Sequence, residues 1–236
     1  MKLSRKEFFY YLLWSLVGVL AITVAWQLDN RVDAALDVDS KPVWIHFGQF
    51  CSKLAEGWAP GLVGIILAIV FMWLRRPAVA AKIFFVVLTC ELTGLACLIL
   101  RTFVGRTRPT AHVPQGIYGM WHDGHWLIGK HEFAAFPSGH TATAVGLVTA
   151  AWLVNRRWGA ALIIFALMVM WARVALETHH FSDVIASAVL AIPLAVLSKK
   201  LLLPYLETQF STMDRSLQAG YLSQSARTSV STKPTQ

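Results

Sequence analysis

Long apolar stretches separated by short polar segments dominate the chain. A helix that crosses the roughly 30 Å hydrocarbon core of a membrane needs about 20 mostly apolar residues, because each residue advances it by about 1.5 Å. Six stretches meet this requirement within a few residues, although the fourth and fifth are short: 8–28, 58–74, 83–100, 141–154, 160–175 and 184–203. The pattern predicts an all-α fold, a polytopic membrane bundle of six transmembrane helices.

Basic residues gather in four short clusters beside these stretches. The clusters are Lys2/Arg5/Lys6, Arg75/Arg76/Lys82, Arg156/Arg157 and Lys199/Lys200. Lysine and arginine are enriched on the cytoplasmic side of membrane spans, and six spans place all four clusters on one side. We therefore expect a multi-pass protein of the cell (inner) membrane with both termini in the cytoplasm. The segments 29–57, 101–139 and 177–182 then lie outside the cytoplasm.

The first of these outer segments carries apolar residues at a helical spacing of three to four: Val43, Trp44, Phe47, Phe50, Cys51 and Leu54. This spacing predicts an amphipathic helix in the membrane interface, and a lid packed on the bundle fits the same pattern. Beyond Leu206 the composition changes to Ser, Thr and Gln. We expect one six-span domain over residues 1–206 and a flexible cytoplasmic tail over 207–236.

Composition supports the membrane assignment. Of the 236 residues, 56% are hydrophobic and 14% are charged, whereas soluble domains have roughly 45–50% apolar and about 25% charged residues. This excludes a soluble globular protein, a wholly disordered chain and a disulfide scaffold. The formal charge of +8 could indicate a nucleic-acid partner. Because the basic residues flank apolar stretches, the lipid bilayer is the expected partner and nucleic acid is not.

Two arginines, Arg101 and Arg108, follow the third predicted span, and Pro109 comes directly after them. Seven residues correspond to about two helical turns, so on a continuing helix both side chains face one way until Pro109 ends it. Guanidinium groups offer planar pairs of donors that match phosphate oxygens. The pair indicates a phosphate site, and side chains reaching for lipid headgroups are the plainer alternative.

The fourth predicted span opens with Phe-Pro-Ser-Gly-His at 136–140. Ser138 is a good helix N-cap, and Gly139 lets a ligand approach the backbone closely. A helix N-terminus has free N–H groups and the positive end of the helix dipole, so it readily receives an anion. His140 then stands in the first turn beside that anion. An ordinary cap with an interfacial histidine is the alternative.

The fifth predicted span ends near Arg173, and His179 and Asp183 follow at a spacing of four. On a helix, side chains four residues apart face each other. A carboxylate that holds one imidazole nitrogen fixes the tautomer and leaves the other nitrogen as a nucleophile or base. A structural ion pair has the same spacing. The topology places all three segments on one side of the membrane, which favours one shared site.

The three segments resemble the signature of the type 2 phosphatidic acid phosphatase family: Lys-x6-Arg-Pro, Pro-Ser-Gly-His and Ser-Arg-x5-His-x3-Asp. This chain has Arg-x6-Arg-Pro at 101–109, Pro-Ser-Gly-His at 137–140 and Ala-Arg-x5-His-x3-Asp at 172–183. The spacing within each motif matches. Arg101 stands where the family has lysine, which keeps the charge and changes its reach. Ala172 stands where the family has serine, which removes a hydroxyl.

The resemblance implies a metal-independent lipid phosphatase that needs no cofactor and acts through a phosphohistidine. In it, His179 attacks phosphorus, Asp183 orients His179 and stabilises its positive charge, and His140 protonates the departing oxygen and later activates water. The groups implied to hold the phosphate are Arg101, Arg108, Ser138, Gly139 and Arg173. The implied substrate is a membrane lipid phosphate or diphosphate at the extracytoplasmic face, of the undecaprenyl diphosphate, phosphatidylglycerol phosphate, phosphatidic acid or lipid A type.

Other functions fit parts of the pattern. A metal site could use outer histidines, which are His122, His125, His131, His140, His179 and His180, but the nearby arginines would repel a cation. A transporter or lipid-binding protein could use the anion site without turnover, and a phosphotransferase could pass the phosphoryl group to an alcohol. Glu91, inside the third span, is expected to make a hydrogen bond between helices. The sequence leaves the oligomeric state open.

Overall fold

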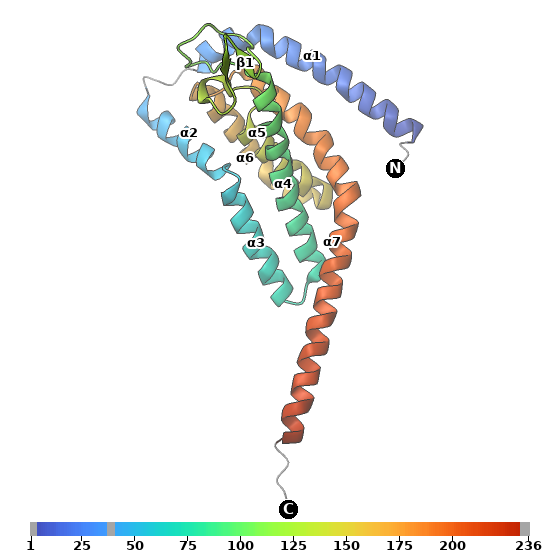
Figure 1. Cartoon of the computed structure of the whole chain (residues 1–236). Helices are drawn as coiled ribbons and strands as arrows, with labels where there is room; N and C mark the ends of the chain where they lie inside the picture. The colour runs from blue at the N-terminus through green and yellow to red at the C-terminus, as the bar shows by residue number, and fades with distance from the viewer. Residues whose placement is uncertain (1–3, 37–40, 232–236) are drawn as a thin grey trace, which may run out of the picture.

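The computed structural model describes residues 4–36 and 41–231 and is mostly helical there (Figure 1). The helices are α1 (Arg5–Leu36), α2 (Pro42–Leu54), α3 (Trp58–Trp73), α4 (Pro77–Val104), α5 (Gly139–Val154), α6 (Arg156–Ala175) and α7 (Phe181–Ser231). Each of the six predicted spans lies on a separate helix, and only residue 74, at the end of the second span, falls outside its helix, by one residue. The prediction of an all-α helix bundle is confirmed.

The number of helices that could cross a membrane is smaller than the six predicted spans. Within the described residues, α1, α4, α6 and the part of α7 up to residue 219 are long and apolar enough to cross a membrane. Helices α2 and α3 qualify only as a pair, which bends by 49° at its break. Helix α5 is apolar but has only 16 residues. Length and composition therefore give four or five spans, and the predicted sixth is not confirmed.

Small residues allow the central helices to approach closely. One core cluster joins Ala81 and Phe85 of α4, Ala150 and Ala151 of α5, and Leu203 of α7. On the other face of α4, a Cβ added at Gly64 of α3 would stand only 1.9 Å from a methyl group of Val87. Such glycine contacts let two helix backbones pack tightly. Figure 1 shows α4 in the middle of the bundle, with α3 on one side and α7 on the other.

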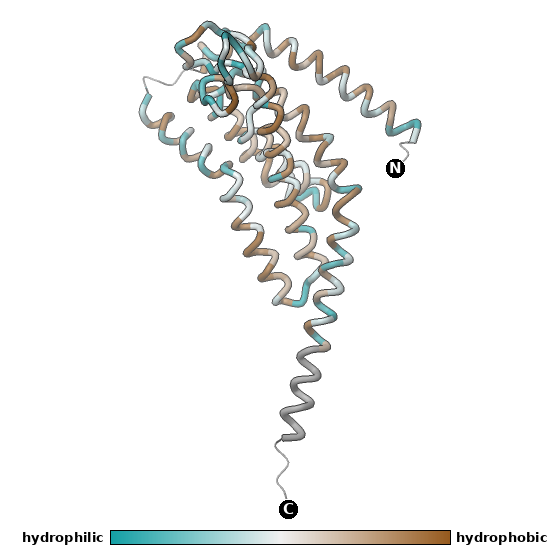
Figure 2. The backbone as a smooth tube through the Cα atoms, in the orientation of Figure 1, coloured by the Kyte–Doolittle hydropathy of each residue, from teal (hydrophilic) through white to brown (hydrophobic). Residues whose placement is uncertain are grey.

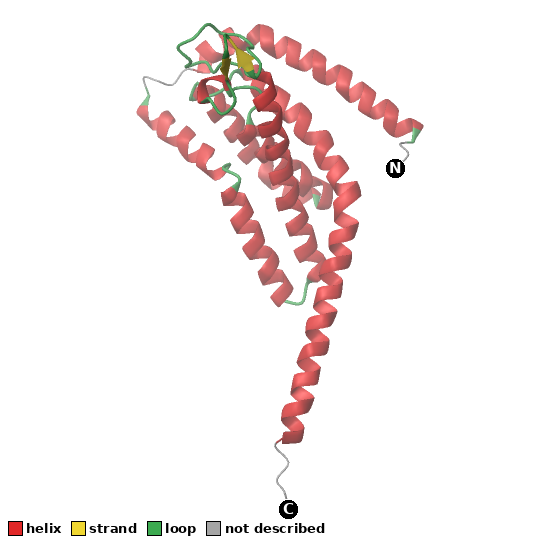
Figure 3. Ribbon diagram, in the orientation of Figure 1, coloured by secondary structure: helices red, strands yellow, loops and turns green. Residues whose placement is uncertain are grey.

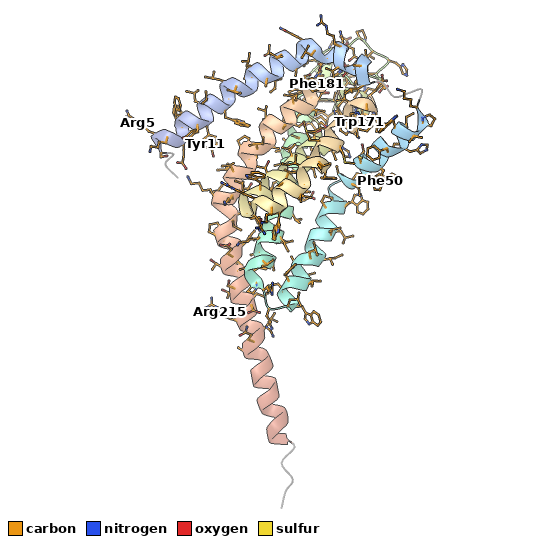
Figure 4. All side chains as sticks on the ribbon, turned by 180° about the vertical axis from the view of Figure 1, so that it is seen from behind. Arg5, Tyr11, Phe50, Trp171, Phe181 and Arg215 are labelled. Atoms are coloured by element: carbon orange, nitrogen blue, oxygen red, sulfur yellow. The ribbon has the colours of Figure 1, made fainter. Side chains whose placement is uncertain are left out.

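Helix α2 packs on the bundle through one face. Its Trp44 and Phe47 lie with ring centroids 5.8 Å and 5.9 Å from that of Trp171 in α6, and Figure 4 shows Trp171 beside this helix. Val43 and Phe50 remain exposed on α2. A helix is present where the amphipathic pattern predicted one, and its position in the membrane interface stays a prediction. Its packed face agrees with a lid on the bundle, and contact of its exposed apolar side chains with lipid stays a prediction.

The basic clusters and the outer loop lie at opposite ends of the bundle. The ammonium of Lys199 donates to the Leu153 carbonyl at 2.6 Å, where α5 ends, and Lys200 contacts Glu7 of α1 at 2.5 Å. Arg75, in the α3–α4 turn, pairs with Asp214 of α7 at 3.1 Å. At the other end, Figure 2 shows hydrophilic residues gathered around the loop between α4 and α5.

That outer loop carries the only strands of the described chain, β1 (Trp121–His122) and β2 (His125–Trp126), and a short 3₁₀ helix, η1 (His131–Phe133) (Figure 3). The strands pair antiparallel, with Trp121 opposite Trp126. A further bridge joins Arg106 to Ile117. These pairings fold the loop over the ends of α4, α5 and α7.

Helix α7 differs from the expected tail. It continues to Ser231, past the end of the bundle, so residues 207–231 are helical where composition predicted a flexible segment; residues 232–236 lie outside the described residues. Two polar side chains of this segment bond within the helix: Thr208 Oγ1 donates to the Pro204 carbonyl at 2.9 Å and Ser211 Oγ to the Glu207 carbonyl at 2.7 Å. The domain limits at 206 and 207 stay predictions.

Candidate active site

The predicted site residues come together at the outer-loop end of the bundle. Arg101 lies in the last turn of α4, and Arg108 lies in the loop that follows. Ser138 and His140 stand at the start of α5. Arg173 lies in the last turn of α6. His179 and Asp183 flank the start of α7.

His179 is fixed with one ring nitrogen bound and the other free. Its Nδ1 lies 2.6 Å from the carbonyl oxygen of Ala135, which requires that Nδ1 carry the proton and donate it. Nε2 is buried and has no hydrogen-bond partner. It therefore carries an unengaged lone pair, as a nucleophile requires.

Asp183 acts on His179 by charge rather than by a direct hydrogen bond. The distance from His179 Nδ1 to Asp183 Oδ2 is 3.7 Å, beyond hydrogen-bond length. The prediction that Asp183 faces His179 is correct in place, but the Ala135 carbonyl makes the hydrogen bond that sets the tautomer. The reason is that His179 precedes α7, so its ring does not follow the helical i, i+4 geometry.

Burial controls the protonation of His179. Removal from water, the largest effect, and the positive charges of Arg173 and Arg108 outweigh the opposing effect of Asp183, and together these effects lower the pKa of His179 from 6.5 to about 4. The ring is therefore neutral at physiological pH. A neutral imidazole with Nδ1 protonated is the form that attacks through Nε2.

Arg108 does not continue the α4 helix, contrary to the sequence prediction. The helix ends at Val104 because Gly105 adopts the left-handed conformation, with φ of +61°, and the chain turns away. The Arg108 guanidinium donates to three backbone carbonyls, those of His131 (2.9 Å), Thr178 (3.2 Å) and Ala134 (3.3 Å). Burial lowers the pKa of Arg108 to about 10, and the charge of Arg101 contributes to this. Arg108 thus ties the outer loop to the turn that carries His179.

Arg173 is buried with unused donors. One Nη1–H donates to Ser52 Oγ of α2 at 3.1 Å, and Nε has no partner. A buried guanidinium with a free N–H is costly unless an anion completes it. Ala172, where the resembling family has serine, is fully buried beside it.

A cavity of about 310 Å³ opens beside Gly139 and His140 at the start of α5. Arg101 lines it from α4, and Glu56 lines it from the α2–α3 turn. A Cβ added at Gly139 would meet no atom within 4 Å, so the helix start faces open space. Ser138 stands at the N-cap position, but its side chain does not cap the helix; its Oγ accepts a hydrogen bond from Thr141 at 3.1 Å.

Arg101 also lines a second cavity, of about 190 Å³, under the outer loop. Arg108, Lys130 and His131 line the same space. The charge of Arg108, together with burial, lowers the pKa of His131, which keeps that ring neutral. Arg101 is therefore the cationic side chain common to both cavities.

Glu91 borders the first cavity from inside α4, below Arg101. Its carboxylate lies against the start of α3, where Cβ atoms added at Gly57 and Gly61 would stand 2.6 Å and 3.2 Å from its oxygens. Oε1 is buried without a hydrogen-bond partner, so the expected hydrogen bond between helices is not formed at this atom.

The structure adds contacts with α1 that the sequence analysis missed. Arg106, between the two predicted arginines, is buried and contacts Asp183 and Asp29 of α1. His180 contacts Asp33 of α1, with 3.0 Å between Nδ1 and Oδ2. The sequence offered one signal, which is Asp29 at the end of the first apolar stretch, because a buried carboxylate needs a partner. Its partner, Arg106, lies 77 residues away in the sequence.

The histidines of the metal alternative do not form a cluster in the described residues. His122 and His125 are exposed on the β-hairpin, whereas His179 is buried below it. Across residues 4–36 and 41–231, no group of three or more His, Cys, Asp or Glu side chains is arranged to hold a metal ion. The site instead suits an anion with an electrophilic centre. It offers a free N–H on Arg173, the start of α5 facing open space at Gly139, and the neutral imidazole of His179.

Comparisons with known proteins point the same way. Undecaprenyl-diphosphatase BcrC of Bacillus subtilis is 30% identical over 133 residues, which cover 56% of this chain and 64% of the relative. The match therefore spans less than two thirds of the relative's length.

Two solved structures share the fold. The crystal structure of LpxE from Aquifex aeolicus aligns with a TM-score of 0.53 and 22% identity, over 73% of this chain and 95% of that chain. The PAP2-type phosphatidylglycerolphosphate phosphatase of Bacillus subtilis aligns with a TM-score of 0.58 and 17% identity, over 80% and 94%. The family model of the PAP2 superfamily matches residues 80–204, more than half of the chain and the whole span from Arg101 to Asp183. The chain belongs to the PAP2 superfamily.

Proposed function

We propose that this protein is an integral membrane phosphatase that removes a phosphate from a lipid phosphate or diphosphate through a phosphohistidine on His179. The observation that carries the proposal is the free, buried Nε2 of a neutral His179, whose Nδ1 donates to the Ala135 carbonyl and whose ring feels the positive charges of Arg173 and Arg108. Anion binding alone needs no such nitrogen, so this feature favours turnover over a transport or binding role.

In the first step, the Nε2 lone pair forms the N–P bond while the P–O bond to the lipid breaks. Arg101 and the free donors of Arg173 neutralise the phosphate oxygens, and the Gly139 N–H at the start of α5 supports them. Arg108 is positioned mainly by backbone carbonyls and adds positive charge from one side. Positioning and charge neutralisation are what phosphoryl transfer chiefly requires.

His140 gives a proton to the departing lipid oxygen and then takes one from the water that attacks phosphorus. That water breaks the N–P bond, releases phosphate and restores neutral His179. In the intermediate, the phosphorylated imidazole ring of His179 carries positive charge. The Asp183 carboxylate stabilises this charge from 3.7 Å. No metal ion takes part in this scheme, so excess EDTA is expected to leave turnover unchanged.

The substrate is expected to enter from the bilayer. The cavity beside His140 is also lined by Leu95 and Leu98 of α4, which supports an acyl or prenyl chain next to the phosphate. The family relatives include enzymes named for undecaprenyl diphosphate and phosphatidylglycerolphosphate. We propose a lipid of this class, at the extracytoplasmic face, with α2–α3 and α5 completing six crossings.

Phosphate release from a panel of lipids by the purified protein tests the proposal. The panel is undecaprenyl diphosphate, phosphatidylglycerol phosphate, phosphatidic acid and lipid A. The variant His179→Ala should lose turnover and phosphoenzyme, while His122→Ala, a histidine exposed on the hairpin, should retain both. A well-folded His179→Ala protein that keeps a tenth of the activity would exclude the nucleophile, and phosphate appearing on an added alcohol would identify a phosphotransferase.

A further inference from the structure

Arg106 lies in the same motif as the phosphate-binding arginines but faces away from both cavities. Its Nη2 donates to Asp29 Oδ2 of α1 at 2.7 Å, and its Nη1 donates to Ser182 Oγ at 2.7 Å and to Asp183 Oδ1. The guanidinium carbon stands 3.7 Å from the ring centroid of Trp26, also in α1. Its side chain is only 6% exposed. Arg106 therefore gives three of its five N–H donors to buried protein partners, and it lines neither cavity.

Asp29 completes the same network from the other side. Its Oδ1 accepts the backbone N–H of Ser182 at 2.7 Å, and its Oδ2 accepts the Ser182 hydroxyl at 2.7 Å. Ser182 is the second residue of α7, where backbone N–H groups have no partner inside the helix. A carboxylate from α1 thus caps the helix that carries Asp183 in its first turn.

From these contacts we infer that Asp29 and Arg106 are positioning residues for the active site, a role that rests on the proposed phosphohistidine reaction. They fix the start of α7 and hold the Asp183 carboxylate in the orientation that supports His179. Asp29 lies outside residues 80–204, the part that matches the PAP2 superfamily. Helix α1 therefore contributes to the active site, although the shared family core does not include it.

The charges show why two residues are needed. A guanidinium paired with Asp183 alone would neutralise the carboxylate that His179 depends on. Asp29 shares the guanidinium through its second nitrogen, so the buried trio of two carboxylates and one cation keeps a net negative charge. The positive charge that the His179 ring gains in the phosphoenzyme is attracted to this net negative charge. The trio therefore stabilises the intermediate more than the free enzyme, which is the condition for raising kcat.

The second acid of α1 supports the same turn. The Asp33 carboxylate contacts the His180 ring at 3.0 Å, and the His180 backbone N–H donates to Asp183 Oδ2 at 2.8 Å. Both oxygens of Asp183 are thus held, one by Arg106 and the other by the His180 backbone. Helix α1 therefore contacts the α6–α7 turn and the start of α7 through two residues, Asp29 and Asp33, which lie one helical turn apart.

The variant Asp29→Asn tests the inference, because it keeps the size and an oxygen for the Ser182 N–H while it removes the charge. We expect kcat to fall about 10-fold to 100-fold, the range seen when partners that orient a functional imidazole site are lost, with KM changed by less than about 2-fold. Asp214→Asn is the matched control, because Asp214 is an equally buried carboxylate paired with an arginine at the far end of the bundle. It should retain wild-type kcat.

The rate of phosphoenzyme formation in a single turnover, normalised to monodisperse protein, separates catalysis from folding. Ser182→Ala gives a second test without a change of charge: it should lower kcat less than Asp29→Asn, and the double variant should lose less than the product of both effects. Unchanged kcat in folded Asp29→Asn, or an equal loss in Asp214→Asn, would overturn the inference. If wild-type protein forms no phosphoenzyme at all, the proposed function fails instead.

Discussion

Protonation of His179 should destabilise the folded protein by a measurable amount. The buried ring has a pKa of about 4, whereas the same ring in the unfolded chain has its ordinary pKa of 6.5. Below pH 6.5 the unfolded state therefore binds more protons than the folded state, and acid favours unfolding. The loss begins as the pH falls through 6.5 and stops growing below about pH 4, where the folded ring is protonated too.

The magnitude follows from the two pKa values. Each unit between folded and unfolded pKa corresponds to about 1.4 kcal/mol once both states have titrated, so going from about pH 7.5 to about pH 5 should cost about 2 kcal/mol from this single group. His179 is 1% exposed, so solvent does not screen the effect appreciably. Other groups titrate over the same range, and their contribution must be subtracted.

His179→Asn provides that subtraction. Asparagine can keep the donor to the Ala135 carbonyl, cannot titrate, and changes stability by a pH-independent offset that cancels in the comparison. Unfolding free energy in mixed micelles, measured at both pH values, should fall about 2 kcal/mol more for the wild type than for the variant. NMR of labelled histidine should show a ring that titrates near pH 4 in the wild type and is missing from His179→Asn. Equal pH dependence of the two proteins, or a His179 titration near 6.5, would refute the reasoning.

Three further perturbations follow from the packing and the topology. Gly64→Val should destabilise the α3–α4 contact by about 1–3 kcal/mol through overpacking against Val87, seen as a lower midpoint of thermal unfolding; an unchanged midpoint would contradict the packing. Arg173→Lys should raise KM for the lipid and weaken vanadate inhibition, because a point charge cannot replace a planar donor pair; unaltered vanadate affinity would exclude Arg173 from the phosphate site. Lys130→Cys should react with an impermeant maleimide in intact cells and Arg156→Cys only after lysis; the reverse pattern would place the site in the cytoplasm.

Local patterns explain the success of the helix predictions. Each apolar stretch is long enough to be helical in a bilayer whatever it packs against, so the six stretches and the amphipathic α2 could be read directly. The end of α4 could not, because the two arginines two turns apart suit a continuing helix and only the φ of Gly105 shows that the helix stops. The helix over residues 207–231 could not be predicted for a related reason. A composition rich in Ser and Thr suggests disorder, but their hydroxyls can donate hydrogen bonds to carbonyls four residues earlier in a helix.

The sequence could predict which residues gather at the candidate site, but not the hydrogen bonds and ion pairs that they make. The spacing of His179 and Asp183 indicated a couple, yet the hydrogen bond to Ala135 comes from 44 residues away and follows no sequence period. Arg106 was visible as a neighbour of Arg108, but nothing local separates an arginine that binds phosphate from one that holds a carboxylate. That distinction depends on Asp29, which only the folded position of α1 brings into contact.

Two cavities meeting at Arg101 give the proposed reaction separate routes for its two products. In the proposed reaction, the dephosphorylated lipid would leave along Leu95 and Leu98 of the first cavity. Free phosphate would leave by the polar path past Lys130 and His131 of the second cavity, whose wall also carries Leu127, Ile128 and Phe133. Inorganic phosphate could then leave while the lipid is still bound, and a molecule that plugs only the polar path would trap the enzyme after turnover rather than compete with the incoming lipid.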